Sequence, residues 1–122
     1  MQLLYTAEQD PIPREIRHIL LPQEIVLRHG HIEAWGNIIK SYHHAHPDHK
    51  VIIKYEGVQV NSLLSLFKRT PHINPRGFVL EVEAEDREWE DVGKLHRLLV
   101  EGASDNYTLY IGQEIHQTLR LF

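Results

Sequence analysis

The apolar residues of the chain recur at the spacing of a helix in three stretches. The first predicted helix runs from His31 to about His44, and its stripe consists of Ile32, Trp35, Ile38, Ile39 and Tyr42. A shorter helix follows Asn61-Ser62, a good helix cap, with apolar Leu63, Leu64, Leu66 and Phe67. The last is predicted to begin at Asp86 and to stop at Gly102, with a core stripe of Trp89, Val92, Leu95, Leu98 and Leu99.

Strand patterns lie between these helices. Residues 51–53 and 58–60 are rich in β-branched side chains and flank Glu56-Gly57, which predicts a hairpin. Residues 78–84 alternate, so a one-sided strand is expected, with Glu81, Glu83 and Glu85 on its exposed side. Residues 24–29 alternate weakly and also suit a strand. Together these elements predict an α+β domain over residues 23–102, an antiparallel sheet with helices on one face.

The two ends of the chain are predicted to be additions to this domain. Residues 1–22 are interpreted as an N-terminal arm, in which residues 14–21 have helical spacing and Pro22 ends the short helix. Residues 103–122 form a C-terminal extension with a predicted strand at 107–111. Its apolar end contains Ile115, Leu119, Leu121 and Phe122, and we expect it to pack on the domain or on a second subunit.

Composition narrows the class of protein. The 122 residues are enough for one domain, and the formal charge of −4 argues against a general nucleic-acid binder. The chain has no cysteine, which excludes disulfides, thiolate metal sites and a cysteine nucleophile. No apolar run is long enough for a membrane span, and the N-terminus does not have the pattern of a secretion signal. We therefore expect a cytoplasmic protein.

Two segments carry a resemblance to a known family. The segment KVIIKYEGVQVN, which starts at Lys50, and the segment GFVLEVEAEDRE, which starts at Gly77, resemble the hairpin and the last strand of the phosphocarrier HPr. HPr belongs to the bacterial sugar phosphotransferase system. The resemblance covers roughly residues 23–102. It implies an open-faced β-sandwich in which three helices cover a four-stranded antiparallel sheet.

The same resemblance selects one histidine. Aligned on Ile38-Ile39, His31 falls on the histidine that carries the phosphoryl group in HPr. An imidazole nitrogen is a good nucleophile near neutral pH, and free N–H groups at a helix start stabilise phosphate. Glu33 and Ala34, however, stand where the family has arginine and proline. A carboxylate close to a phosphoryl group is repulsive by about 1 kcal/mol or more at surface dielectric.

These departures lead to two alternative functions. The first is a divergent HPr-like protein that serves as a non-enzymatic interaction or regulatory module, with a protein partner or self-association. The alternative is a phosphocarrier that accepts a phosphoryl group on His31. Ser62 and Ser65 lie near the regulatory serine position of the family, although Ser62 equally suits a helix cap. The sequence contains no Gly-rich phosphate loop or zinc-protease motif, and we expect no cofactor.

Ten histidines are unusual for a chain of this length, and four of them cluster at the end of the first predicted helix: His43, His44, His46 and His49. Imidazole groups bind transition metals, but this spacing matches no established motif. A solvated helix end, where protonated histidine also favours the helix dipole, is the other interpretation. We predict no metal site and leave the role of the cluster open.

Overall fold

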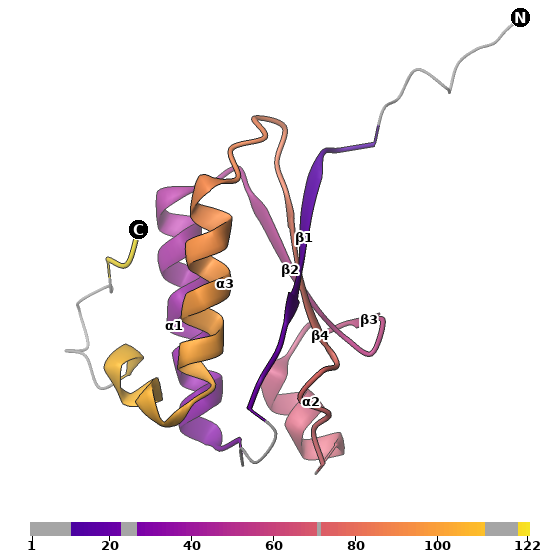
Figure 1. Cartoon of the computed structure of the whole chain (residues 1–122), viewed down its shortest axis with the longest axis vertical. Coiled ribbons are helices and arrows are strands. Elements are labelled where there is room, and N and C mark those ends of the chain that lie inside the picture. Colours follow the sequence, from indigo (N-terminus) through magenta and orange to yellow (C-terminus); the bar gives the residue numbers. More distant parts are fainter. Residues whose placement is uncertain (1–10, 23–26, 71, 112–119) are drawn as a thin grey trace, which may run out of the picture.

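Strand β4 (Phe78–Glu83) lies inside a four-stranded antiparallel sheet ordered β1-β4-β2-β3. Its neighbours are β1 (Arg14–Ile19) and β2 (Lys50–Tyr55), and the short β3 (Val58–Gln59) forms the far edge. This computed structural model describes residues 11–22, 27–70, 72–111 and 120–122. Helices α1 and α3 lie side by side against one face of the sheet (Figure 1). The predicted α+β open-faced sandwich is confirmed.

The helices have the predicted order. Helix α1 (His29–Ala45) precedes the β2–β3 hairpin, α2 (Leu63–Arg69) follows it, and α3 (Glu90–Gly102) comes after β4. A 3₁₀ helix, η2 (Asp105–Tyr110), packs against both α1 and α3. In the part of the chain described above, no helix is both long and apolar enough to cross a membrane.

The hydrophobic core lies between the sheet and the helices α1 and α3. The β4 side chains that alternate toward the helices, Phe78, Leu80 and Val82, are fully buried. They meet the predicted stripes of the two helices, whose most buried members are Trp35, Ile38, Tyr42, Val92, Leu95 and Leu99; Ala34, which was not in the predicted stripe, is buried with them. The hydrophobic periods of the sequence therefore identified most of the core.

The predicted helix at residues 14–21 is wrong, because residues 14–19 form strand β1. All six residues pair with β4, from Arg14 opposite Glu83 to Ile19 opposite Phe78. The side chains alternate between exposed and more buried, as strand geometry requires. Tertiary pairing with β4 thus overrides a helical spacing of only a few apolar residues.

The strand predicted at 24–29 is not present in its described part. Leu27 and Arg28 lie outside any strand, and His29 begins α1. Residues 24–26 lie outside the described residues.

Three further predictions need correction. Helix α3 begins at Glu90 rather than Asp86, because the Asp86 side chain accepts the Glu88 N–H and makes a turn in which Arg87 has a φ of 55°. Residues 107–110 belong to η2 rather than to a strand. The predicted exposed side of β4 is not fully exposed: Glu81 is buried, because Arg14 and Lys54 from the neighbouring strands cover its carboxylate at 3.1 and 2.8 Å.

The last residues of the chain pack on α1. The Leu121 N–H donates to Ser41 Oγ at 2.9 Å, and the Phe122 ring meets the Tyr42 ring edge-on at 5.1 Å between centroids. Leu121 and Phe122 are therefore partly buried against the domain, one of the two packing arrangements that we expected for this end. Ile115 and Leu119 lie outside the described residues.

Candidate functional site

His31, the predicted phosphoryl acceptor, lies in the first turn of α1 and is 5% exposed. Its Nδ1 accepts the backbone N–H of Arg28 at 2.8 Å, so the proton of the neutral ring is on Nε2. Nε2 then donates to the Ser104 carbonyl at 3.1 Å. The ring also packs on Tyr107 at 4.3 Å between centroids. His31 thus ties the start of α1 to the start of η2 and satisfies a backbone donor at the helix end.

These contacts give the Gly30-His31 pair a structural role that does not require a catalytic one. A Cβ at Gly30 would overlap the Tyr107 ring, so glycine is what lets η2 approach α1. A phosphoryl group would need a free nitrogen lone pair, and the Nδ1 lone pair already accepts a hydrogen bond. Glu33 is exposed on α1, whereas Ala34 is fully buried in the core. The role of His31 as a phosphoryl acceptor stays a prediction that would require breaking these contacts.

The two serines of α2 have a structural arrangement. Ser62 is the N-cap of the helix, and its Oγ accepts the backbone N–H of Ser65 at 3.2 Å. Both side chains are exposed; the Ser62 side chain caps the helix, whereas Ser65 contributes only its backbone N–H. Phosphorylation of Ser62 or Ser65 stays a prediction.

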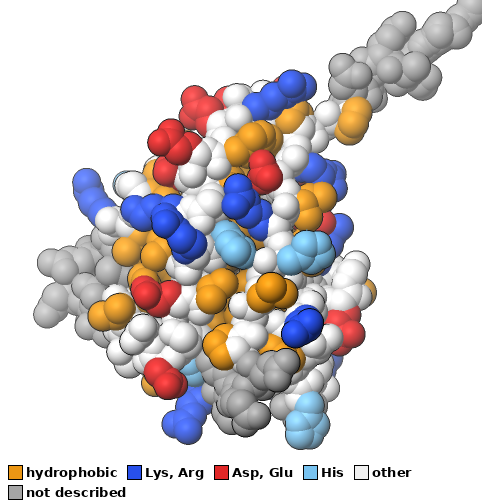
Figure 2. All heavy atoms as spheres, in the orientation of Figure 1, with side chains coloured by type: hydrophobic (Ala, Val, Ile, Leu, Met, Phe, Trp, Pro, Cys, Tyr) orange, Lys and Arg blue, Asp and Glu red, His pale blue; other side chains and the backbone are white. Residues whose placement is uncertain are grey.

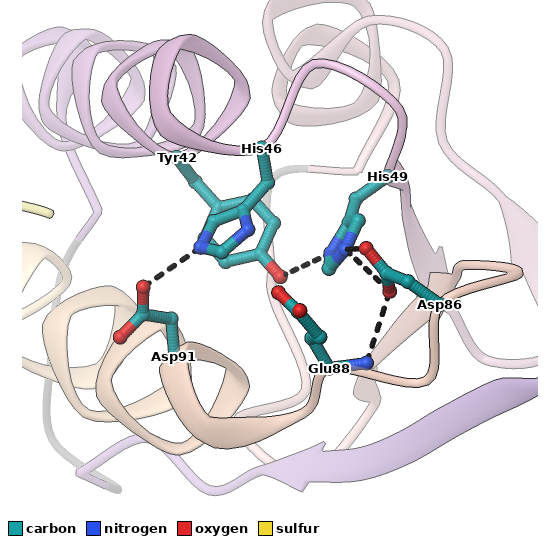
Figure 3. A network of polar contacts seen from close by, with 6 residues as sticks. All are labelled: Tyr42, His46, His49, Asp86, Glu88 and Asp91. Carbon is teal, nitrogen blue, oxygen red and sulfur yellow. Dashed lines mark hydrogen bonds and ion pairs between the residues drawn. The ribbon is translucent and has the colours of Figure 1, made fainter.

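The histidine cluster divides into two pairs. His43 and His44 are exposed on the last turn of α1. His46 and His49 follow the end of α1, and their rings stack at 4.6 Å between centroids. Both rings face the start of α3 (Figure 3). Each accompanies one aspartate: His46 Nε2 is 2.7 Å from Asp91, and His49 Nε2 is 3.0 Å from both oxygens of Asp86.

Tyr42 of α1 contacts both of these histidines. Its hydroxyl is 2.8 Å from His49 Nδ1, and its ring stacks on His46. Burial, and then the charges of Asp91 and Asp86, raise the Tyr42 pKa far above its ordinary value, so the hydroxyl keeps its proton and donates to His49. His49 Nε2–H in turn donates to Asp86. The Asp86 pKa is lowered, first by the Glu88 N–H and then by His49, so this carboxyl stays ionised.

We call the five side chains Tyr42, His46, His49, Asp86 and Asp91 the His–Asp network. A pocket of about 380 Å³ opens beside it, lined by His46, Glu88, Trp89, Glu90 and Asp91. None of these five lining residues has a hydroxyl, thiol or amino group that the His46–Asp91 pair could deprotonate. Over the described ranges, no group of three or more His, Cys, Asp or Glu side chains is placed to hold a metal ion.

Sequence reasoning selected His46 and His49 but missed their partners. Asp86 and Asp91 lie 37 and 45 positions away from these histidines, and the turn that aims Asp86 depends on tertiary structure. Trp89 and Tyr42 were assigned only to core stripes. The short Asp86-to-Glu88 turn was the one local signal that could have indicated an oriented carboxylate.

Comparison with known proteins relates the sequence of this chain to one family. Residues 17–109 match the family model described as "Uncharacterised Treponema protein C-terminal domain". The chain belongs to this family. The matched residues contain His31 and all of the His–Asp network, and they include part of β1.

A curated relative of the chain is an uncharacterised protein of Treponema pallidum (strain Nichols). It is 30% identical over 99 residues, which is 80% of the present chain. The chain spans only 28% of the length of this relative, which is a much longer protein. No solved structure matches the chain. Neither description states a function, and the functional part of the HPr resemblance stays a prediction.

A second tyrosine of the domain gives a pH-dependent prediction. Burial, and then its hydrogen bond to Glu101, raise the pKa of Tyr110 from 10.0 to about 12. The folded state therefore holds this proton more tightly than the unfolded chain. We expect the free energy of unfolding to fall as pH rises from about 10 to about 12, because the unfolded state loses the proton first. Denaturant titrations across this range measure the slope.

The matched variants for this prediction are Tyr110→Phe and Tyr107→Phe. The first should make the alkaline loss of stability less steep but not abolish it, because the Tyr110 hydroxyl is gone while Tyr42 and Tyr55 also have raised pKa values. The second removes one tyrosine from the same 3₁₀ helix and leaves the Tyr110–Glu101 hydrogen bond in place. An unchanged slope in Tyr110→Phe would show that other groups cause the alkaline loss.

Proposed function

We propose that this domain is a non-enzymatic interaction module of the cytoplasm, which binds a protein rather than nucleic acid and needs no cofactor. The observation that carries the proposal is the exposed edge strand β1. Ile12, Ile16 and Leu20 are 48%, 51% and 62% exposed, and they recur at every fourth position through the strand and its two flanks. An edge strand with exposed apolar side chains is a ready site for another chain.

The surface around β1 supports docking of a protein. The register puts Ile16 in a row with Glu81 and Ile52, on the sheet face that α1 and α3 do not cover. Arg14 donates to Glu81 and to Glu83 at 3.1 and 2.8 Å, so its guanidinium is fixed beside the apolar residues. Figure 2 looks onto β1 and α3 and shows hydrophobic side chains interleaved with cationic ones and histidines. Such a mixed surface suits a specific protein contact.

The phosphocarrier alternative has less support. Both ring nitrogens of His31 make hydrogen bonds, and Tyr107 packs against the ring. The His–Asp network is likewise internally satisfied at His49, where Tyr42 and Asp86 occupy both nitrogens. An interaction role uses the surface of the domain and leaves these buried contacts intact.

Photo-crosslinking tests the proposal. With p-benzoylphenylalanine at position 16, ultraviolet irradiation of the full chain in its own cells should give a discrete crosslinked species, because the edge would be in contact with its partner. The control has the same group at Leu109, which is 61% exposed but lies on η2. We expect no discrete product from the control.

Two results would contradict the proposal. One is the absence of any product at position 16 beyond that of the Leu109 control. The other is acid-labile phosphate on His31 after incubation with phosphoenolpyruvate and the general phosphodonor protein of the sugar phosphotransferase system, which would favour the phosphocarrier alternative.

A further inference from the structure

The backbone of β1 has one paired side and one outward side. Pro13 accepts the Ala84 N–H at 3.0 Å, which sets the phase of the ladder with β4. Because antiparallel strands alternate, Glu15, Arg17 and Ile19 also turn their backbone groups toward β4. The backbone groups of Arg14, Ile16 and His18 therefore point outward, and β1 is the terminal strand of the sheet order. This outward side is a template for one more strand.

We propose that a second copy of this chain occupies this edge, with the two β1 strands antiparallel and related by a two-fold axis at Ile16. The inference rests on the proposed function and names its partner. In this register Ile16 faces Ile16 of the second copy, and Ile12 faces Leu20. The exposed apolar residues of β1 and its two flanks then bury one another on the uncovered face of the sheet.

The opposite face of the same register pairs unlike charges. Glu15 comes opposite Arg17 of the second copy, and the two-fold axis repeats this pair. Arg17 Nε is buried without a hydrogen-bond partner within the described part of the chain, and its nearest carboxylate oxygen, on Glu15 of its own chain, is 4.0 Å away. The Arg17 side chain as a whole is 39% exposed, so a carboxylate from the second copy can pair with its charge from the solvent side, although Nε itself is covered.

The remaining groups at this edge are compatible with pairing. Arg14 would lie opposite His18 of the second copy, and its charge is already compensated by Glu81 and Glu83. The His18 carbonyl accepts from His96 Nε2 of α3 at 2.8 Å. A carbonyl oxygen has two acceptor positions, so it can also accept the backbone N–H of Arg14 from the second copy.

The opposite edge of the sheet differs in length. Strand β3 has two residues, whereas β1 has six, and short edge strands are one way in which proteins avoid pairing. Pro11 and Pro13 have no N–H. They are at positions whose backbone groups face toward β4 rather than outward, so neither removes a donor from the outward side. The geometry therefore favours β1 as the pairing edge.

Charge reversal tests the register. Sedimentation velocity of the wild-type chain over a concentration series should show a reversible monomer–dimer equilibrium. Glu15→Arg alone brings two guanidinium groups together at each pair across the axis, and Arg17→Glu alone brings two carboxylates together there. Each variant should therefore weaken association by about tenfold or more. An equimolar mixture of the two variants should recover dimers, because both pairs across the axis then have opposite charge.

A disulfide tests the position of the axis. The chain has no cysteine, so Ile16→Cys gives a single thiol. Hydrogen-bonded antiparallel pairs have Cα atoms about 5.5 Å apart, a distance that a disulfide spans. Mild oxidation of dilute protein should therefore link Ile16→Cys into a covalent dimer much faster than the control Val58→Cys, whose position is 70% exposed on β3.

The outcomes separate this inference from the proposed function. A wild-type chain that stays monomeric up to about 1 mM would overturn the inference. So would a mixture of the charge variants that does not recover dimers, or equal crosslinking rates at positions 16 and 58. If the photo-crosslinked product at position 16 has the mass of a different protein, the interaction module stands and the second copy is excluded as its partner.

Discussion

Replacing Phe78 with alanine is expected to lower the free energy of unfolding by about 3–5 kcal/mol. Phe78 is fully buried at the start of the inner strand β4. Its ring contacts Trp35 of α1 at 5.2 Å and Tyr55 of β2 at 4.8 Å between centroids. The truncation therefore leaves a cavity where the sheet meets α1. Urea unfolding followed by circular dichroism measures the loss.

Val58→Ala is the matched control. Val58 is 70% exposed on the short edge strand β3, so its truncation should change stability by no more than about 0.5 kcal/mol. Phe78→Leu should fall between the two, because it keeps part of the buried volume. If Phe78→Ala lost less than about 1 kcal/mol, the sheet–helix interface would not be the principal core.

Replacing His49 with alanine is expected to be the next most damaging change. The His49 side chain is 1% exposed and makes hydrogen bonds to Tyr42 and Asp86. Its removal leaves the buried Tyr42 hydroxyl without its partner, which costs about 1–3 kcal/mol, and the lost ring adds a cavity. Thermal and urea unfolding at neutral pH measure the effect.

A double-mutant cycle with Tyr42→Phe separates these two contributions. In the wild-type background, Tyr42→Phe should destabilise, because His49 Nδ1 loses its donor. In the His49→Ala background the same change should cost nothing or restore some stability, because the hydroxyl is then an unpaired group. His44→Ala, an exposed member of the same cluster, is the control and should be nearly neutral. Equal effects of Tyr42→Phe in both backgrounds would show that the two side chains are not coupled.

Most of the fold could be predicted from the sequence because its hydrophobic periods are long. The stripe of α1 and the alternation of β4 each extend over several repeats, and burial on one side of each element produces them directly. Strand β1 and the residue after it have only Ile16, Ile19 and Leu20 as their apolar pattern, and these three residues have the spacing of a helix. What makes this segment a strand is the pairing with β4, which local sequence does not contain.

The candidate site was predictable only in part for a related reason. The density of histidines indicated the end of α1, but the orientation of each ring depends on aspartates from another part of the chain. His31 illustrates the opposite case. Its position at a helix start invited a chemical interpretation, whereas Arg28 and Ser104 give both of its nitrogens a structural role. The pairing of a histidine with backbone groups leaves no signature in the sequence.

The pairing of β1 with β4 also constrains the order in which the domain folds. Arg14 and its partner Glu81 are 67 positions apart, so β1 leaves the ribosome well before β4 and has no partner strand until most of the domain has followed. Closing so long a loop costs more entropy than closing the β2–β3 hairpin. During synthesis the apolar residues of β1 therefore remain exposed to other chains until β4 has been made. The edge strand of the finished sheet is thus also a strand that joins the sheet late.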